Sequence, residues 1–464
     1  MKQLQYRKYA HESIESRPLT TIARKAINIA ASTILTSAFA TQSFAQATST
    51  RFVAFKDFIE NTRSAPVTNF VSRAETKVKE PATLEEMRQA ILERYKGVEA
   101  SHSFVLDSQH YDCVPINQQP AFRIYGLRSV APAPPAELLQ HQVVNEAHVA
   151  RARGIEEDQL FDVFGNSTRC EANTVPLLRT TLETMSNFAS LKQYYSKSPD
   201  NVAPAILTRR AVTSAITPAV ASTHKYATAD QEVNNWGGNS NISIYSPGVN
   251  RPKGETFSLS QEWYDGGAGL SLQTVEVGWI VYPNMFNSSE QSHFFIFSTP
   301  DGYRSGCYNN TCGDFVQVAE SGVLGSTFSN YSVLGGTQYE VSAEYRFYQG
   351  NWWLGKDGTW IGYYPGTKYG GGQLDQYAEH IEFGTETVGT TIWPPSGSGR
   401  FATDGPNYAA YQHNLYYLDL NGNHVWDSLT TFQPSNCYSI WGPFTGTGTW
   451  VEYFYEGGPG GTGC

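Results

Sequence analysis

Two alternating segments of the chain place a glutamate and a glycine where a strand would turn both to the same side. Glu276 stands two residues before Gly278, and Gly384 stands midway between Glu382 and Glu386. Side chains two residues apart in a strand share a face. Glycine within a strand often marks a place where a ligand approaches the backbone. We therefore expect two such strands to form the floor of a cleft that carries two acids.

Two carboxyl groups at close range can perform acid–base chemistry on water. They do not both ionise readily, so one takes up a proton from water while the other donates one. A strand glutamate more often lies on a solvated face, however. Alternation alone also cannot separate Glu382 from Glu386.

Other catalytic and metal-binding signatures are weak or absent in the sequence. It contains no H-E-x-x-H, G-x-S-x-G or C-x-x-C motif. Residues 419–423, with Asp427 beyond, resemble half of a calcium loop, but the glycine is misplaced for an EF-hand and position twelve lacks an acid. We predict a simple hairpin there, with no metal and no cofactor.

The elements that must position these acids are strands. Residues 257–263, 274–281 and 339–345 alternate between apolar and polar positions, and Asn421-Gly422 is a typical hairpin turn. Short strands without intervening helices predict an all-β fold, an antiparallel two-sheet β-sandwich of the jelly-roll kind, over residues 223–464.

Residues 48–198 have a different pattern, which predicts a small α+β unit. A helix is expected over residues 82–95, with Thr83 as its cap in a capping box. A second helix is expected over residues 177–195. Short strands are expected around Cys113 and over residues 161–164.

The two remaining segments indicate export and processing. Residues 1–47 resemble a signal peptide that ends in Ala45-Gln46-Ala47. Residues 199–222 contain three prolines and many small residues, which indicates a cleavable linker, although an ordinary interdomain linker would have the same composition. We expect a secreted protein, extracellular or periplasmic, without a membrane span.

The six cysteines are consistent with an oxidising compartment. Six cysteines allow 15 connectivities, and pairing of sequential neighbours is the expected one. That pairing joins Cys113 to Cys170, Cys307 to Cys312 and Cys437 to Cys464.

Charge divides unevenly along the chain. Residues 225–464 contain 8 Lys and Arg against 22 Asp and Glu, a net charge of −14, whereas residues 48–224 contain 19 of each. Nucleic-acid binding requires basic patches, so the acidic second half argues against it.

Many short motifs, in order, resemble the neprosin family of glutamic peptidases. In the second half they are FSLSQ at 257–261, VEVGW at 275–279, DGY at 301–303, GCYN at 306–309 with Cys312, NWWL at 351–354, IGYYP at 361–365, GTE at 384–386, GSG at 397–399 and GGPGG at 457–461. In the first half they are YDCV at 111–114 and QQPAF at 118–122. The resemblance runs from about residue 82 to the end.

This resemblance implies a secreted, acid-acting endopeptidase that cleaves beside proline and is made as a zymogen. It assigns the two catalytic glutamates to Glu276 and Glu386, which separates Glu386 from Glu382. The family usually has Gly-Gly-Glu, whereas Thr385 precedes the glutamate here. We expect Thr385 to point to the opposite face.

The mechanism and the partners follow as expectations. Glu276 is assigned as the base and Glu386 as the acid. Gly278 and Gly384 are expected to line the cleft, and Tyr364 and Trp353 are candidates to hold the proline ring. Peptides or proteins are the expected substrates, and the pro-segment is the expected intramolecular inhibitor.

Two other functions remain open from the residues alone. A secreted glycan-binding or glycan-hydrolysing β-sandwich also uses aromatic surfaces, and a glycosidase also needs two carboxylates. A non-catalytic protein with a neprosin domain is the other alternative.

Overall fold

The seven-stranded sheet contains both of the glutamate-bearing strands. In the computed structural model of the chain, residues 51–139, 149–197 and 223–464 are described. The strand order of this sheet is β10-β9-β8-β7-β15-β5-β19. Its strands are β10 Cys307–Tyr308, β9 His293–Thr299, β8 Gln273–Val281, β7 Glu255–Gly266, β15 Ala378–Gly389, β5 His224–Asn235 and β19 Thr430–Phe432.

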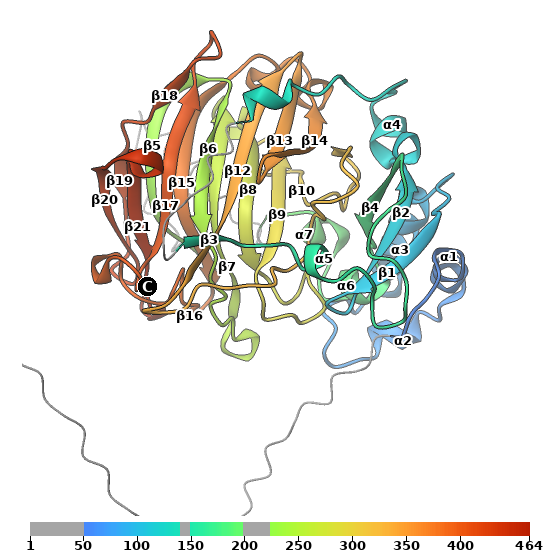
Figure 1. Cartoon of the computed structure of the whole chain (residues 1–464). Helices are drawn as coiled ribbons and strands as arrows, with labels where there is room; N and C mark the ends of the chain where they lie inside the picture. The colour runs from blue at the N-terminus through green and yellow to red at the C-terminus, as the bar shows by residue number, and fades with distance from the viewer. Residues whose placement is uncertain (1–50, 140–148, 198–222) are drawn as a thin grey trace, which may run out of the picture. The chain divides into compact units, whose positions relative to one another are not determined.

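A ten-stranded sheet lies beside it (Figure 1). Its main path is β11 Val316–Gln317, β14 Thr359–Pro365, β13 Asn351–Lys356, β12 Gln338–Tyr348, β6 Gly237–Ser243, β17 Ala410–Leu418, β21 Glu452–Gly457 and β20 Ser439–Thr445. β18 His424–Trp426 pairs with β17, and β3 Val149–Arg151 pairs in parallel with β12. β16 Ile392–Trp393 and β22 Gly461–Thr462 form a separate two-stranded sheet.

The core lies between the two large sheets, because one face of each strand is apolar. Val275, Val277 and Trp279 of β8 pack in one buried cluster with Val341 and Tyr345 of β12. The indole of Trp279 also donates a hydrogen bond of 2.9 Å to the backbone oxygen of Ser243 in β6. The expected mostly β, antiparallel architecture is therefore confirmed.

The N-terminal region forms the small α+β unit that the sequence predicts. Its sheet, in the order β1-β2-β4, contains β1 His102–Leu106, β2 Gln109–Pro115 and β4 Thr174–Leu178. Its helices are α1 Phe55–Ser64, α2 Thr68–Val71, α3 Pro81–Arg94, α4 Pro120–Ile124, α5 Ile155–Asp158, α6 Leu182–Ser186 and α7 Leu191–Tyr194. Short 3₁₀ turns in the chain are η1 Ile116–Gln118, η2 Ala136–Leu138, η3 Arg251–Lys253, η4 Gly269–Ser271, η5 Gly366–Tyr369, η6 Gln373–Asp375, η7 Ala402–Asp404 and η8 Gly448–Trp450.

Three local expectations for this unit are wrong in detail. Helix α3 begins at Pro81 after Glu80 and has no side-chain cap, so Thr83 lies inside the first turn rather than capping it. The single helix expected over residues 177–195 is instead the end of β4 followed by α6 and α7. Residues 161–164 contain only one isolated bridge, between Phe161 and Ser167.

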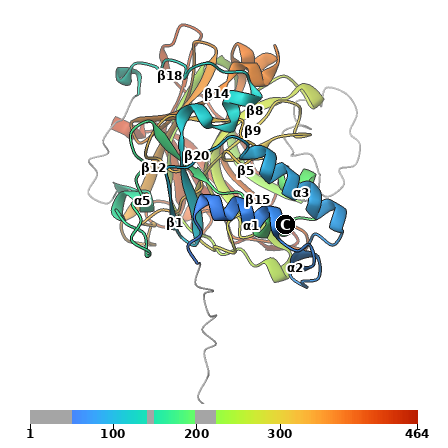
Figure 2. The same cartoon turned by 90° about the vertical axis from the view of Figure 1, so that its right-hand side faces the viewer.

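Helices of this unit cover the outer face of the seven-stranded sheet (Figure 2). Leu84 and Met87 of α3 and Met185 of α6 belong to the same buried cluster as Leu259 of β7 and Phe297 of β9. Residues Ser49–Cys464 accordingly form one compact unit. The face that carries the glutamates is therefore shielded from solvent.

All three disulfides follow the expected sequential pairing. Cys113 is bonded to Cys170, Cys307 to Cys312 and Cys437 to Cys464. The hairpin expected around residues 421–422 is also present, between β17 and β18. In the described part of the chain, no helix combines the length and the apolar character that a membrane crossing requires.

Candidate active site

Glu276 and Glu386 lie on the covered face of the seven-stranded sheet, on two strands separated by β7. Glu276 of β8 stands opposite Trp263 of β7. Glu386 of β15 stands opposite Leu259 of β7 on one side and Tyr226 of β5 on the other. Both glutamate side chains are fully buried. A buried carboxylate is costly unless it is paired, so its partners define the site.

Glu276 is held by four donors, each from a different element or loop. Its Oε1 accepts hydrogen bonds of 2.8 Å from the hydroxyl of Thr274 and of 2.8 Å from the hydroxyl of Tyr303. Its Oε2 accepts a hydrogen bond of 2.9 Å from the amide of Gln261 and contacts the ammonium of Lys197. The carboxylate is thus fixed in one orientation.

Glu386 is held by two residues of β5 and by the same lysine. Its Oε1 contacts His224 Nδ1 and accepts a hydrogen bond of 3.1 Å from the hydroxyl of Tyr226. Its Oε2 lies 3.1 Å from Lys197 Nζ. Burial opposes the ionisation of Glu386, but the charges of Lys197 and His224 outweigh it and lower its pKa to about 2.

Lys197 is the residue that joins the two glutamates. Its side chain is buried, and its nitrogen contacts both carboxylates. Because each contact has hydrogen-bond length, the two carboxylates lie no more than about 6 Å apart. Burial alone would lower the pKa of Lys197, yet the negative charges of Glu276 and Glu386 raise it above the usual lysine value. Lys197 therefore occupies the space between the two acids as a cation.

Aromatic rings surround the ammonium of Lys197. It lies 5.2 Å from the ring centre of Trp263, 5.7 Å from that of Phe297 and 5.9 Å from that of Tyr303. These distances are within the range of cation–π attraction. We call these three rings the aromatic box.

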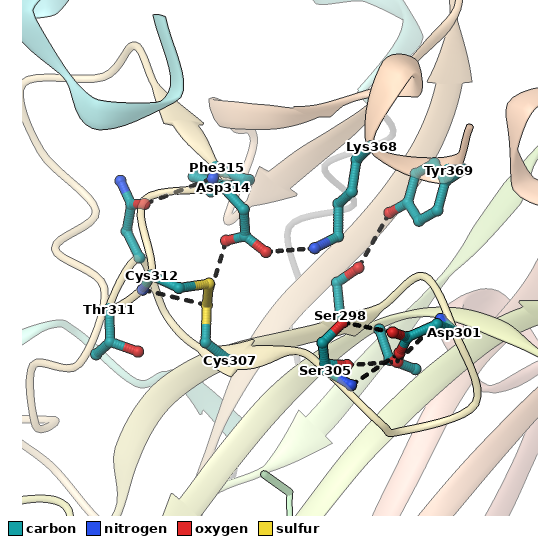
Figure 3. Close-up of polar contacts among 12 residues, drawn as sticks. Ser298, Asp301, Ser305, Cys307, Thr311, Cys312, Asp314, Phe315, Lys368 and Tyr369 are labelled. Atoms are coloured by element: carbon teal, nitrogen blue, oxygen red, sulfur yellow. Dashed lines mark hydrogen bonds and ion pairs between the residues drawn. A yellow bond between two sulfur atoms is a disulfide. The ribbon is translucent and has the colours of Figure 1, made fainter. Parts of the chain in front are cut away.

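The loop after β9 positions Tyr303 against Glu276. Tyr303 has a positive φ of 60°, and its backbone N–H donates a hydrogen bond of 3.0 Å to Thr299 Oγ1. Asp301 stabilises the same loop by accepting hydrogen bonds from the backbone and the hydroxyl of Ser305 (Figure 3). The loop is therefore built to present one hydroxyl to the site.

The neighbouring loop, which the Cys307–Cys312 disulfide closes, is also held by an aspartate. Asp314 lies next to the Cys307–Cys312 bond and pairs with Lys368, as Figure 3 shows. Cys307, Cys312 and Asp314 are also the group of described residues whose ligand atoms lie close enough together to hold a metal ion. Their two sulfurs are bonded to each other, so they do not supply thiolate ligands.

Gly278 and Gly384 stand on either side of Gln261 in one row across the sheet. A Cβ at Gly278 would collide with the backbone of Ser260, and one at Gly384 would collide with that of Ala227. Gly384 also has a φ of +140°, which disfavours other residues. Both glycines allow neighbouring strands to approach at the row next to the acids.

Trp353 and Tyr364 are not brought to the glutamates. Tyr364 lies in the core between the two large sheets, where its ring contacts those of Phe315 and Tyr345. Trp353 belongs to a separate cluster with Phe122 and Tyr363. We therefore do not assign these two residues to the substrate cleft.

Sequence reasoning missed most of the partners of the two acids. Gln261 and Trp263 could have been found, because alternation in β7 places both on one face of a motif that was already recognised. The sequence could not readily predict three other partners, His224, Tyr226 and Tyr303. They come together only because distant strands pair and a loop positions Tyr303 against Glu276. Lys197 precedes the expected linker and has no sequence pattern that marks it.

Comparisons with known proteins identify a known domain within the all-β part of the chain, residues 223–464, which we call the β-region. Residues 254–459 match the model of the neprosin family. The chain thus carries a neprosin domain, and the resemblance seen in its motifs is confirmed.

Two solved structures of scytalido-glutamic peptidase also match, one with a transition state analog inhibitor and one with a peptide based transition state analog. Each has 8% sequence identity and a TM-score of 0.29, and each match covers 50% of this chain and 97% of that chain. Similarity at this level carries no information about the reaction of this chain.

Proposed function

We propose that this protein is the zymogen of a glutamic endopeptidase that acts in acid and uses Glu276 and Glu386 to activate water. The observation that carries the proposal is the pair of contacts from both carboxylates to one nitrogen. A water molecule held at that position would lie within hydrogen-bond reach of both acids.

Hydrolysis then needs no further reactant. One carboxylate takes a proton from the water as the water oxygen bonds to the carbonyl carbon. The other carboxyl supports the carbonyl oxygen and gives its proton to the amine nitrogen as the C–N bond breaks. Because the pair must hold one proton, activity should fall at both low and high pH.

We propose that the aromatic box, rather than Trp353 and Tyr364, receives the proline ring. Trp263, Phe297 and Tyr303 already enclose the lysine beside the two acids. Flat apolar rings provide large contact areas for a rigid pyrrolidine. Proline preference itself is an expectation from the family.

The proposed inhibitor is residues 48–198, which act through Lys197. Helices α3 and α6 cover the sheet face, and the lysine fills the space that the water would need. The proposed signal peptide at 1–47 and the proposed linker at 199–222 lie outside the described residues. The three disulfides support the proposed secretion.

The catalytic proposal is tested with three glutamine variants of the full chain. Glu276→Gln and Glu386→Gln should each abolish the cleavage of a proline-containing peptide at pH 3–5, measured after acid treatment. Glu382→Gln is the matched control, because Glu382 is a buried glutamate on the same strand and face. We expect it to retain activity.

A polysaccharide panel in the same assay distinguishes the main alternative. Carboxyl groups about 5 Å apart also occur in retaining glycosidases, so the geometry does not separate the two reactions. Cleavage of a glycan by the wild type, with no peptide cleavage, would overturn the peptidase proposal. Equal activity of Glu276→Gln and the wild type would overturn the residue assignment.

A further inference from the structure

The two glutamates differ in the partners that remain when Lys197 is removed. Among the described residues, the other hydrogen-bond partners of Glu276 are neutral, since they are the side chains of Thr274, Gln261 and Tyr303. Two carboxyls that share a proton need such a difference to decide which one ionises.

Glu386, by contrast, keeps a partner that can carry a positive charge. Its Oε1 contacts Nδ1 of His224, whose side chain is buried. His224 belongs to β5, two residues from Tyr226, which stands directly opposite Glu386. The imidazole and the carboxylate are therefore held together by the pairing of β5 with β15.

Packing fixes the histidine ring in this position. It is nearly parallel to the ring of Tyr226, with centres 6.2 Å apart, and it meets Phe257 of β7 edge to face at 6.2 Å. The Tyr226 hydroxyl also lies 3.3 Å from His224 Nδ1. A histidine held in this way does not need the pro-segment to stay beside Glu386.

We propose that His224 is a positioning residue that keeps Glu386 ionised in acid, so that Glu386 is the base and Glu276 the acid of the mature enzyme. This inference rests on the proposed function and reverses the roles expected from the sequence. A histidine beside a carboxylate is cationic in acid, and a cation favours the charged form of its neighbour.

The titratable groups that face Glu386 support its assignment as the base. They are His224 and Tyr226 from β5, Lys197 after α7, Tyr308 from β10, Tyr303 from the loop after β9 and Glu276 from β8. Of these groups, the only two that can be cations are Lys197 and His224. After the lysine has left, His224 is the remaining cation among these described groups whose charge lowers the pKa of Glu386.

The test is the pH profile of kcat for acid-treated His224→Gln. The base must be ionised, so activity is lost below its pKa. An opposite charge within about 4–6 Å lowers a carboxyl pKa by roughly one to three units. We expect the acidic limb of the profile to move up in pH by about that amount, while the limb at higher pH stays in place.

His413→Gln is the matched control, because His413 and Glu340 form another buried pair, 2.8 Å apart, in the ten-stranded sheet. Its profile should coincide with that of the wild type. If His224→Gln and His413→Gln share the wild-type acidic limb, the role of His224 is refuted while the peptidase remains. An inactive wild type would instead refute the proposed function.

A second measurement does not depend on how His224→Gln folds. The ring signals of His224 can be compared by NMR at one acidic pH in the wild type, in Glu276→Gln and in Glu386→Gln. We expect loss of the Glu386 charge to move these ring signals away from their wild-type positions and loss of Glu276 to move them much less, because Glu386 is the carboxylate in contact with the ring. Equal changes in the two variants would overturn the proposed asymmetry.

Discussion

At the scale of single residues, Lys197 has the largest consequence for the state of the site. Its single positive charge lies between two acids that would otherwise repel one another in a buried environment, and it offsets that repulsion. A cation buried between carboxylates stabilises both charges, and removal of one partner of such a group is usually costly. The covered form should therefore depend on this side chain.

Replacement of Lys197 by methionine, which has a similar length and no charge, tests that dependence. The lowered pKa of Glu386 means that its ion pairs contribute fully above its ordinary pKa of about 4.5 and are lost as the pH falls toward about 2. Without the lysine, protonation begins at higher pH. We expect the midpoint pH of maturation, followed by gel electrophoresis, to rise by about one unit or more.

Lys192→Met is the control for that experiment, because Lys192 is exposed on α7 and lies five residues before Lys197. It should mature like the wild type. Identical maturation profiles for Lys197→Met and Lys192→Met would show that the lysine does not hold the covered form.

The two glutamates show how far residue patterns reach. Alternation found the face of Glu276 and Glu386, but it could not choose between Glu382 and Glu386. The choice came from the family motif. Lys197 lies 79 sequence positions from Glu276, and no local sequence pattern predicts a contact over that separation.

At the scale of elements, β15 shows how the sheet accommodates a departure from the family motif. Thr385 lies between Gly384 and Glu386 and points away from the site. Its hydroxyl donates a hydrogen bond of 2.8 Å to the backbone oxygen of Leu259 and contacts Ser396. The threonine thus ties β15 to β7 behind the glutamate.

Thr385→Val retains the shape of the side chain and removes these polar contacts. A lost buried hydrogen bond costs about 1–3 kcal/mol when a partner remains unsatisfied. We expect urea unfolding to show a loss of stability in this range, with little change in kcat/KM for a proline peptide.

Thr390→Val provides the comparison, because Thr390 follows β15 and is exposed. Its change in stability should be within about 0.5 kcal/mol. If Thr385→Val lost activity without loss of stability, Thr385 would act on the reaction and not on the sheet.

Element prediction succeeded where the period was long and uninterrupted. The strands β7, β8 and β12 and the helix α3 were expected from their patterns. The helix expected over residues 177–195 failed because Thr174–Leu178 pairs with β2, and that pairing joins residues that are distant in the sequence. The rest of that segment forms two short helices instead of one, because Thr181 caps the start of α6 and Ser190 caps the start of α7.

At the scale of the whole molecule, buried acids make stability depend on pH. Glu456 lies in β21, where it accepts a hydrogen bond from Ser260 of β7. Burial raises its pKa to about 7, although hydrogen bonds from Ser260 and Gln412 oppose the rise. Burial also raises the pKa values of Glu262 and Asp427 well above the ordinary range. We therefore expect the β-region, residues 223–464, to be more stable in acid than near neutral pH.

The raised pKa values determine whether stability increases or decreases with pH. A carboxyl whose pKa is higher in the folded state contributes fully below its ordinary value of about 4.5, and that contribution is lost as the pH rises through about 7. Glu456 alone accounts for roughly 3 kcal/mol over that window. We expect the midpoint of urea unfolding to be higher at pH 4 than at pH 7.

Glu456→Gln should remove part of this difference, because glutamine cannot ionise. Glu290→Gln, at an exposed position, should leave it unchanged. Equal midpoints at pH 4 and pH 7 in the wild type would contradict the assignment of buried, protonated acids.

The two cations at Glu386 come from opposite sides of residues 198–222. Lys197 immediately precedes this stretch, and His224 follows it within β5. A single cut anywhere in the stretch would divide them between two products. The smaller product would take away the charge that blocks the acids, and the larger would keep the charge that we assign to the reaction. Cleavage of one peptide bond would thus remove the cation that both acids share and leave a cation at Glu386 alone. The sheet would not need to rearrange.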